Sequence, residues 1–386
     1  MEEPIPMLDL KREYEYLKPA IDAAIQRCLE HQRWIWGPEV AEFEQKVAAY
    51  LETKHAIGVS SGTDALVLAL RALAIKYKGK EFFDPEDEII TTPFTFTATG
   101  MAILRAGATP VFVDIDPHTF NIDPEGIRAY LQERGERVVG MLPVHLYGQA
   151  ADMDAIMELA RAYDLFVLED VAQAFGGAWK EQKLGSIGTA GAFSFFPSKN
   201  LGAFGDGGMV VTQDDELADL VRKLSRQGGR DKYNAEHVGY NARLDTLQAA
   251  ILLAKLDHLD EFNERRRTVA ATYTAGLSGL DHLIPPQEAP GAHHVYHQYT
   301  VWVKRDREGL QAHLSAQGIA SMIYYPVPLH RMQAFQGRSI LAGSLSVAEE
   351  AARSVLSLPI GPLQEEAVTF KVLNAVQFWA AREVDT

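Results

Sequence analysis

Lys199 lies beside a run of glycines that would let a bound molecule approach its amine. The segment AFSFFPSKNLGAFGDGG (residues 192–208) places this lysine after a β-like run and before Gly202, Gly205, Gly207 and Gly208. Glycines allow the backbone to come close to a ligand, and a lysine partly removed from water is the usual Schiff-base nucleophile. The alternative is a surface loop whose lysine faces solvent.

Residues near position 170 have the types that such a lysine would need if it bound pyridoxal phosphate (PLP). Asp170 ends the apolar run LFVLED, where its carboxylate could keep a ring nitrogen protonated so that the ring accepts electrons. Ala172 is small enough for a flat ring to lie close, and Gln173 could donate to the ring's phenolic oxygen. Taken alone, Asp170 is equally well explained as a helix N-cap.

A phosphate group would need backbone N–H groups at the start of a helix. The segment HAIGVSSGTDALVLALRAL (residues 55–73) has the pattern of a strand that leads into a helix through Gly62 and Thr63. Ser194 could add a second hydroxyl, and Phe96 could stack on the cofactor's ring. The alternatives are an ordinary capped helix and an aromatic residue of the core.

The pattern around these residues predicts an α/β fold. Short apolar runs predict strands within residues 55–61, 87–93, 109–116, 138–148, 165–172, 190–196 and 207–212. Amphipathic stretches predict helices at 63–75, 97–106, 124–133 and 152–163. This alternation favours a large mixed, mostly parallel sheet with helices on both faces. We place this PLP-binding domain at residues 1–258.

The C-terminal third has a different pattern, which predicts a smaller α+β domain at residues 259–386. Residues 244–277 indicate one long helical stretch, and a segment with Pro and Gly follows at 281–291. Then come the β-like runs HQYTVWV (297–303) and SMIYYPVP (321–328), with a helix-like stretch at 307–317 between them.

Composition limits the classes of protein that need to be considered. The chain has 386 residues, 47% of them hydrophobic, and a net charge of −15, which disfavours nucleic acid as the main partner. No run approaches the roughly 20 apolar residues of a membrane span, and the start MEEPIPMLDL is unlike a secretory signal. The single cysteine, Cys28, allows no internal disulfide and suits a reducing cytoplasm.

The motifs together resemble the DegT family of PLP-dependent nucleotide-sugar aminotransferases, which have the aspartate aminotransferase fold (fold type I). The shared segments run from WIWGPEVAEFE (34–44) to YYPVPLH (324–330). Between them lie SSGTDAL, TPFTFTATG, PVFVDIDPHTFNIDP, PVHLYGQAADMDAI, LEDVAQAFGG, SFFPSKNLGAFGDGGMVVT and GYNARLDTLQAAIL. Their common order over nearly the whole chain is not expected by chance.

The resemblance implies a role for each site residue. Lys199 would form the Schiff base, Asp170 would hold the pyridinium nitrogen, and Gln173 would contact the ring oxygen. The resemblance also implies that Phe96 stacks on the ring and that Gly62, Thr63 and Ser194 bind the phosphate.

Two further positions concern the subunit interface and the substrate. Asn241 of the GYNAR segment would reach the phosphate in the neighbouring subunit, which implies a homodimer with shared active sites. Arg243 would meet the carboxylate of the amino donor or part of the sugar nucleotide, unless it forms a surface salt bridge. Tyr324 and Tyr325 would contact substrate, and they stand where relatives acting on uronic acid sugars often have His-Tyr.

The resemblance implies a two-stage transamination. L-Glutamate would convert PLP to pyridoxamine phosphate, and a keto sugar linked to UDP or dTDP would then receive the amino group. Lys199 would act as general base and then as general acid. The segments SFFPSK and YYPVP favour C3 of a 3-keto hexose over C4 of a 4-keto-6-deoxy sugar.

Other functions remain as alternatives. One is a non-catalytic protein of the same fold that binds sugar or has a regulatory role. Another is a dehydratase of the same family, but such relatives usually carry histidine where this chain has Lys199. The glycines after Lys199 do not open a helix in a dinucleotide-binding register.

Several features are set aside. His293, His294 and His297 lack acidic or cysteine partners at zinc-type spacing, so no metal is predicted. His145 is expected to be a core residue with its hydrogen bonds satisfied rather than a site residue, and Arg265, Arg266 and Arg267 are expected to face solvent. Segment 76–88 is longer than the turn usual at this place, and it is either an elaboration of the substrate side or interface or simply tolerated.

Overall fold

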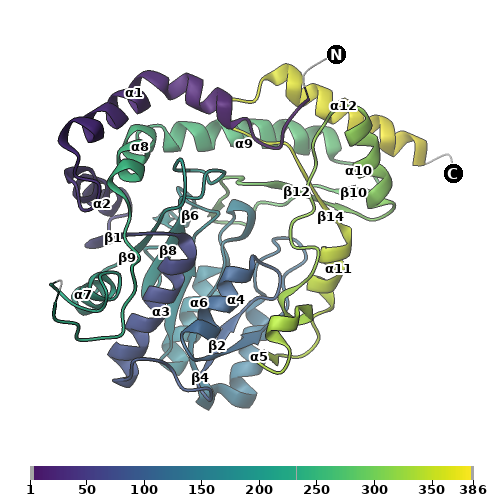
Figure 1. The fold of residues 1–386 in the computed structure, drawn as a ribbon. Coiled ribbons are helices and arrows are strands. Elements are labelled where there is room, and N and C mark those ends of the chain that lie inside the picture. Colours follow the sequence, from purple (N-terminus) through teal and green to yellow (C-terminus); the bar gives the residue numbers. More distant parts are fainter. Residues whose placement is uncertain (1–3, 232, 384–386) are drawn as a thin grey trace.

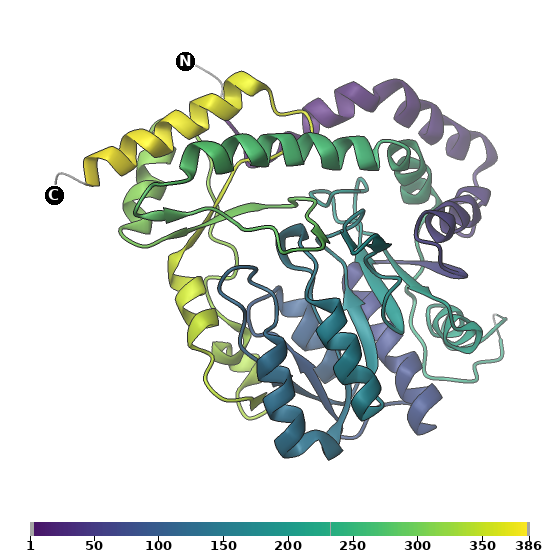
Figure 2. The ribbon, with the colours of Figure 1, turned by 180° about the vertical axis from the view of Figure 1, so that it is seen from behind.

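The computed structural model describes residues 4–231 and 233–383, and its central element is an eight-stranded sheet (Figures 1 and 2). The strand order is β1-β9-β8-β5-β4-β2-β3-β13. The strands are β1 (His55–Val59), β2 (Glu88–Thr91), β3 (Thr109–Phe112), β4 (Val138–Met141), β5 (Phe166–Asp170), β8 (Ala190–Ser194), β9 (Gly208–Thr212) and β13 (Ile340–Leu341). All pairs are parallel except those that β9 makes with β1 and β8. The predicted mostly parallel α/β sheet is confirmed.

Helices cover both faces of this sheet because successive side chains of a buried strand point to opposite sides. In β5, Leu168 packs into one hydrophobic cluster and Val167 into the other. On the Leu168 face lie α3 (Gly62–Lys78), α4 (Thr97–Arg105) and α7 (Asp215–Leu224). The other face carries α2 (Pro38–Tyr50), α5 (Pro124–Arg134), α6 (Met153–Tyr163) and α8 (Thr246–Leu256).

A separate hydrophobic cluster lies in the C-terminal third. There an antiparallel sheet of β10 (Leu283–Ile284), β12 (Tyr299–Val303) and β14 (Val355–Leu358) packs with α9 (Leu259–Leu277), α10 (Arg307–Ala316) and α12 (Glu366–Glu383). Helix α9 crosses the molecule beside the large sheet in both views (Figures 1 and 2). Because β13 pairs with β3, this third also supplies an edge strand to the large sheet. The domain boundary at residue 258 stays a prediction.

The remaining elements are short apart from α1 (Leu10–His31), which packs on α8. A small sheet contains β6 (Ala178–Trp179), β7 (Gln182–Lys183) and β11 (Ala292–His293), and α11 (Ser346–Ser354) precedes β14. Single 3₁₀ turns occur at Gly135–Arg137, Leu146–Gly148, Leu329–Arg331 and Gln333–Phe335. Within the described ranges, no helix has the length and apolar character needed to cross a membrane.

The prediction of one long helix over 244–277 is wrong, since the stretch forms α8 and α9 with a break at Asp257 and His258. No glycine or proline marks this break. The His258 N–H instead closes a tight turn onto the Lys255 carbonyl at 3.0 Å. Helix α8 is buried against α1 and α2, so packing rather than local propensity fixes where the chain turns.

The run SMIYYPVP is also not a strand. Only Met322 pairs, with Ser357, and Tyr325 has a φ of 61°, which a strand does not allow. Pro326 and Pro328 lack the N–H groups that a ladder needs. The segment is therefore a loop, and this loop brings two tyrosines to the cavity described below.

The expectation that Arg265, Arg266 and Arg267 all face solvent fails at Arg266. This residue is 2% exposed, and its guanidinium donates to the Ile360 carbonyl at 3.2 Å. Burial lowers the pKa of Arg266 to about 10, and the nearby Glu13 opposes that effect. Arg266 is thus a structural residue that joins α9 to the chain ahead of α12.

Candidate active site

A cavity of about 500 Å³ lies where β5 and β8 end and where α3 and α4 begin. Nine of the eleven predicted site residues line it. They are Gly62, Thr63, Phe96, Asp170, Gln173, Ser194, Lys199, Tyr324 and Tyr325. The structure therefore gathers predicted site residues from five separate stretches of the chain, and of the eleven only Asn241 and Arg243 lie outside this cavity.

Lys199 is positioned by a tight turn that follows β8. Its backbone N–H donates to the Phe196 carbonyl at 2.8 Å. The chain folds back closely here, because a Cβ on Gly202 would lie 2.2 Å from the Pro197 carbonyl oxygen. The amine lines the cavity, and burial lowers the pKa of Lys199 to about 8 while the charge of Asp170 acts to raise it. Lys199 is therefore not a solvent-facing residue of a surface loop.

This lowered pKa predicts how the reactivity of the amine depends on pH in the cofactor-free protein. Only the neutral amine is nucleophilic, so labelling of Lys199 should rise as pH increases towards about 8 and level off above it. Competitive labelling with an amine-reactive reagent, read by peptide mass spectrometry, measures this profile. A small lysine derivative in the same tube should keep gaining reactivity up to its own pKa of about 10.4. If Lys199 followed the same curve as the derivative, the amine would not be desolvated.

Asp170 is held rigidly at the end of β5. Its carboxylate is 5% exposed and accepts hydrogen bonds from the Thr99 hydroxyl at 2.9 Å and the Ala172 N–H at 3.2 Å. Burial raises the pKa of Asp170, whereas these hydrogen bonds and the charge of Lys199 lower it. Thr99 was missed by the sequence reasoning, although it lies in the same TFTATG motif as Phe96. A buried carboxylate of this kind is suited to a positively charged partner inside the cavity.

The start of α3 provides donors for an anion. Ser61 caps the helix by accepting from the Asp64 N–H at 3.0 Å. Within residues 4–231 and 233–383, no acceptor is present for the N–H groups of Gly62 and Thr63. A Cβ on Gly62 would lie 2.5 Å from the Ser194 Cβ, so only glycine allows α3 and β8 to meet this closely. Free N–H groups at a helix start bind phosphate.

Gln173 links Tyr147 to the loop at residues 321–328, which carries Tyr324 and Tyr325. Its side-chain oxygen accepts from the Tyr147 N–H at 2.8 Å, and its Nε2 donates to the Tyr325 hydroxyl at 2.5 Å. One Nε2 hydrogen remains for a ligand. Phe96 is 60% exposed where it borders the cavity, which leaves its ring face available for stacking.

His297 also lines the cavity, which sequence reasoning did not anticipate. A series of amide contacts fixes its tautomer. Asn263 donates to the Phe175 carbonyl, and Asn200 donates to Asn263 Oδ1 at 2.7 Å, so Asn200 Oδ1 must accept from His297 Nδ1 at 3.1 Å. The lone pair of His297 is therefore on Nε2. Burial and the charge of Lys199 hold the pKa of His297 well below its usual range, so the ring is neutral.

Asn241 and Arg243 lie away from this cavity. Asn241 is exposed and forms an antiparallel bridge with Arg226. The guanidinium of Arg243 lies 5.6 Å from the centre of the Trp36 ring. The reach of Asn241 into a neighbouring subunit, and the contact of Arg243 with substrate, stay predictions.

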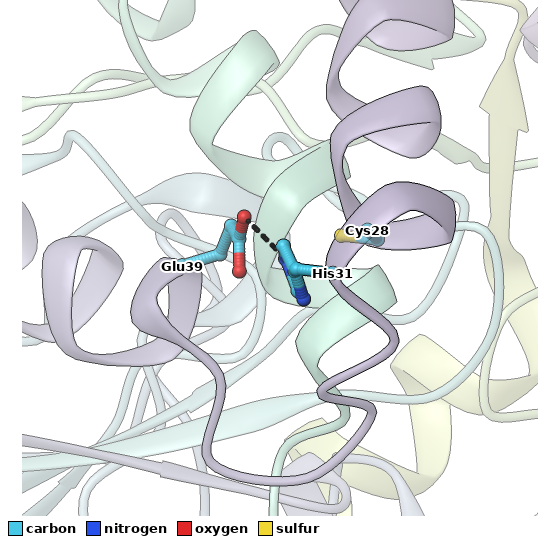
Figure 3. A group of neighbouring side chains, drawn as sticks. All are labelled: Cys28, His31 and Glu39. Atoms are coloured by element: carbon cyan, nitrogen blue, oxygen red, sulfur yellow. Dashed lines mark hydrogen bonds and ion pairs between the residues drawn. The ribbon is translucent and has the colours of Figure 1, made fainter.

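One group of possible metal ligands occurs in the described part of the chain, and it lies outside the histidine cluster at 293–297 (Figure 3). It consists of Cys28, His31 and Glu39. His31 Nδ1 accepts from the Arg33 N–H at 3.0 Å, so its Nε2 carries the proton and donates to Glu39 at 3.1 Å. Neither nitrogen of His31 has a free lone pair for a metal in this arrangement.

His145 is fully buried, as expected of a core residue. Its Nδ1 accepts from the Ala151 N–H at 3.1 Å, and its Nε2 donates to Glu169 at 3.0 Å. Both ring nitrogens are satisfied, and the residue does not line the cavity. The interpretation of His145 as a structural residue is confirmed.

Comparison with known proteins identifies the family to which this cavity belongs. The model of the DegT/DnrJ/EryC1/StrS aminotransferase family matches residues 15–377. The chain belongs to this family. The resemblance inferred from the motifs is thereby confirmed, and the protein is an aminotransferase.

Relatives match along nearly the whole length of the chain. A protein of Geobacillus stearothermophilus named pleiotropic regulatory protein is 47% identical, over 97% of this chain and 98% of that protein. The dTDP-3-amino-3,4,6-trideoxy-alpha-D-glucose transaminase of Streptomyces venezuelae is 46% identical, over 98% and 97%. Among solved structures, DesV of S. venezuelae has a TM-score of 0.92 at 46% identity, covering 98% of this chain and 99% of that chain.

Aminotransferases of this family use PLP, and the cavity fits that cofactor. It has unpaired N–H groups for a phosphate at the start of α3, a buried carboxylate on Asp170 for a ring nitrogen, and an amine on Lys199 with a lowered pKa. The exposed ring of Phe96 can cover a flat aromatic group. These features match the phosphate, the pyridine ring and the aldehyde of PLP in turn.

Proposed function

We propose that the protein transfers the amino group of L-glutamate to a keto sugar linked to a nucleoside diphosphate, UDP or dTDP. The observation that carries this proposal is the meeting of Lys199, Asp170 and the free N–H groups of Gly62 and Thr63 in one cavity. Each of these features has another explanation alone. Together, in a member of an aminotransferase family, they support amino transfer.

Each residue of the cavity would have a separate role in the reaction, set by its position. PLP, when bound, would supply an electron sink for the reacting carbon as that carbon loses its proton. Lys199 moves a proton between that carbon and the cofactor's C4′ carbon, which a neutral amine does as base and an ammonium does as acid. Asp170 holds a proton on the ring nitrogen, and Gln173 orients the ring through its remaining Nε2 hydrogen. Gly62, Thr63 and Ser194 anchor the phosphate.

The same proposal includes a homodimer that works in the cytoplasm. Asn241 is exposed on a loop instead of lining the cavity of its own chain, which supports its use by a second copy. Arg243 comes two positions after Asn241 in the sequence and would contact the donor carboxylate or the sugar nucleotide. The single Cys28 is buried as a free thiol, in keeping with a reducing compartment.

We further propose that the amino group is placed on C3. The 46% identical S. venezuelae relative is named for a 3-amino sugar, which supports this position. With ¹⁵N-labelled glutamate, we expect kcat/KM to be at least about 100-fold higher for a 3-keto than for a 4-keto hexose nucleotide. Mass spectrometry of the product measures the incorporated label. Equal turnover, or a preference for the 4-keto sugar, would show the position to be wrong.

The G. stearothermophilus relative has a regulatory name, which supports a second candidate function. In this alternative, the protein has the PLP-dependent fold and binds sugar without turnover. The same assay separates the two. Formation of 2-oxoglutarate from glutamate in the presence of PLP requires a working Lys199 site, whereas a non-catalytic binder would produce none with any amino acid or keto sugar.

A further inference from the structure

Segment 76–88, which is longer than expected, is firmly packed and lies outside the cavity. Phe83 is 3% exposed, and its N–H donates to the Ala106 carbonyl at 2.9 Å. Lys78 pairs with Asp87 at 2.8 Å, which closes the segment across its two ends. The segment is therefore a well-packed part of the fold, and its contacts indicate what it does.

Its central residues, Glu81 and Phe82, enclose the guanidinium of Arg71. Arg71 extends from α3 and has no exposed surface. It donates to the backbone carbonyl of Glu81 and, at 2.9 Å, to the Glu81 carboxylate. The Phe82 ring lies 3.6 Å from the guanidinium carbon. A buried arginine paired in this way fixes the position of the carboxylate as well as its own.

Glu81 and Arg71 together hold the stretch 237–240. The Glu81 carboxylate contacts His237 Nδ1 at 2.8 Å and accepts from the Val238 N–H at 3.2 Å. Arg71 donates to the Val238 carbonyl at 3.2 Å and to the Tyr240 hydroxyl at 2.7 Å. The stretch 233–236 before it is exposed and is anchored separately, by a bridge between Ala235 and Gly229 and by an ion pair between Glu236 and Lys223 at 2.6 Å.

The fixed stretch leads directly to Asn241 and Arg243. The Tyr240 N–H donates to the Leu224 carbonyl at 2.7 Å, and the Tyr240 carbonyl accepts from the Gln227 N–H at 2.9 Å. Asn241 follows this stretch directly and is bridged to Arg226, and the next residue is held by the Ala242 N–H, which donates to the Ser225 carbonyl at 3.1 Å. Asn241 and Arg243 are the two predicted site residues that the cavity of the same chain does not contain.

We propose that Glu81 is a positioning residue for the shared active site. Through Arg71 and His237, it holds Asn241 in the conformation that reaches the phosphate site of the neighbouring subunit, so segment 76–88 serves that site without touching it. This inference rests on the proposed function, which assigns Asn241 to the second copy.

The test compares Glu81→Ala and Glu81→Gln with the control Glu86→Gln. Glu86 lies in the same segment but is exposed. The first readout is amide hydrogen exchange of residues 234–243 in the cofactor-loaded protein. Loss of a charged hydrogen bond should raise the exchange rate about tenfold in both Glu81 variants and leave the control unchanged. The glutamine variant keeps the size of the side chain, which covers the case in which the alanine variant does not fold.

The second readout is the dissociation constant of PLP, measured for Glu81→Ala, Asn241→Ala and the double variant. Each single change should weaken binding about tenfold, and the double variant should be no weaker than Asn241→Ala alone. Additive losses would overturn the proposal, because they would show that Glu81 acts independently of Asn241.

The outcomes separate the inference from the proposed function. If Asn241→Ala weakens PLP binding but the Glu81 variants change neither exchange nor affinity, the positioning role is wrong and the shared site stands. If Asn241→Ala has no effect on PLP affinity, the shared site itself is wrong, and the role of Glu81 fails with it.

Discussion

Replacing Lys199 with alanine is expected to lower the rate of amino transfer by more than about 10⁴-fold, because one side chain provides both the bond to the cofactor and the proton transfer. Among residues 4–231 and 233–383, no second lysine lines the cavity to take over this role. The measurement is the initial rate of 2-oxoglutarate formation from glutamate with a keto sugar nucleotide. Circular dichroism and size-exclusion chromatography check that the variant folds and assembles as the parent does.

Two further lysine variants separate chemistry from charge. Lys199→Arg keeps a positive charge but does not give up its proton at neutral pH, so it should be as inactive as the alanine variant. Lys11→Ala removes a lysine whose side chain is 86% exposed on α1, and it should retain full activity. If Lys199→Ala retained activity close to that of the parent, another residue would have to be the base.

Much of the fold follows from local patterns, which explains why the sequence predicts it. Strand β5 is buried along its whole length and begins with the apolar residues Phe166, Val167 and Leu168 because both of its faces are covered, and α3 begins where Ser61 can cap it. Both signals are readable without the structure. The break between α8 and α9 is not, because it depends on how α8 packs against α1 and α2. The direction of Arg266 depends in the same way on a carbonyl 94 positions away.

The site residues show the same difference between local motifs and contacts with distant partners. Lys199, Asp170 and Gly62 belong to compact motifs, and the structure brings them together. The sequence does not predict His297 and Thr99 as site residues, because their roles depend on partners from other elements. The tautomer of His297 is fixed by Asn200, and its neutral state by burial and the charge of Lys199, and neither effect can be read from the residues next to it in the sequence. In the same way, the contacts of segment 76–88 with the stretch 237–240 join parts of the chain that are far apart in the sequence, so local patterns do not predict them.

The second large effect is expected at Asp170. Asp170→Asn keeps the shape of the side chain and its hydrogen bond from Thr99 but removes the negative charge. A ring nitrogen facing a neutral amide would lose its proton, and the ring would then be a poorer electron sink. Amino transfer should fall by on the order of 10³-fold, the magnitude typical for loss of one preorganised electrostatic contact at a reacting group.

The charge and the geometry of Asp170 can be separated with Thr99→Val. This change removes one hydrogen bond of 2.9 Å and leaves the carboxylate with the Ala172 N–H and the nearby charge of Lys199. Because the Thr99 hydrogen bond lowers the pKa of Asp170, its loss should raise that pKa further and shift the acid limb of the pH–rate profile towards higher pH. The rate at the optimum should fall by about tenfold at most. If Asp170→Asn were no slower than Thr99→Val, the negative charge would be dispensable, and Asp170 would serve this site through hydrogen bonding alone.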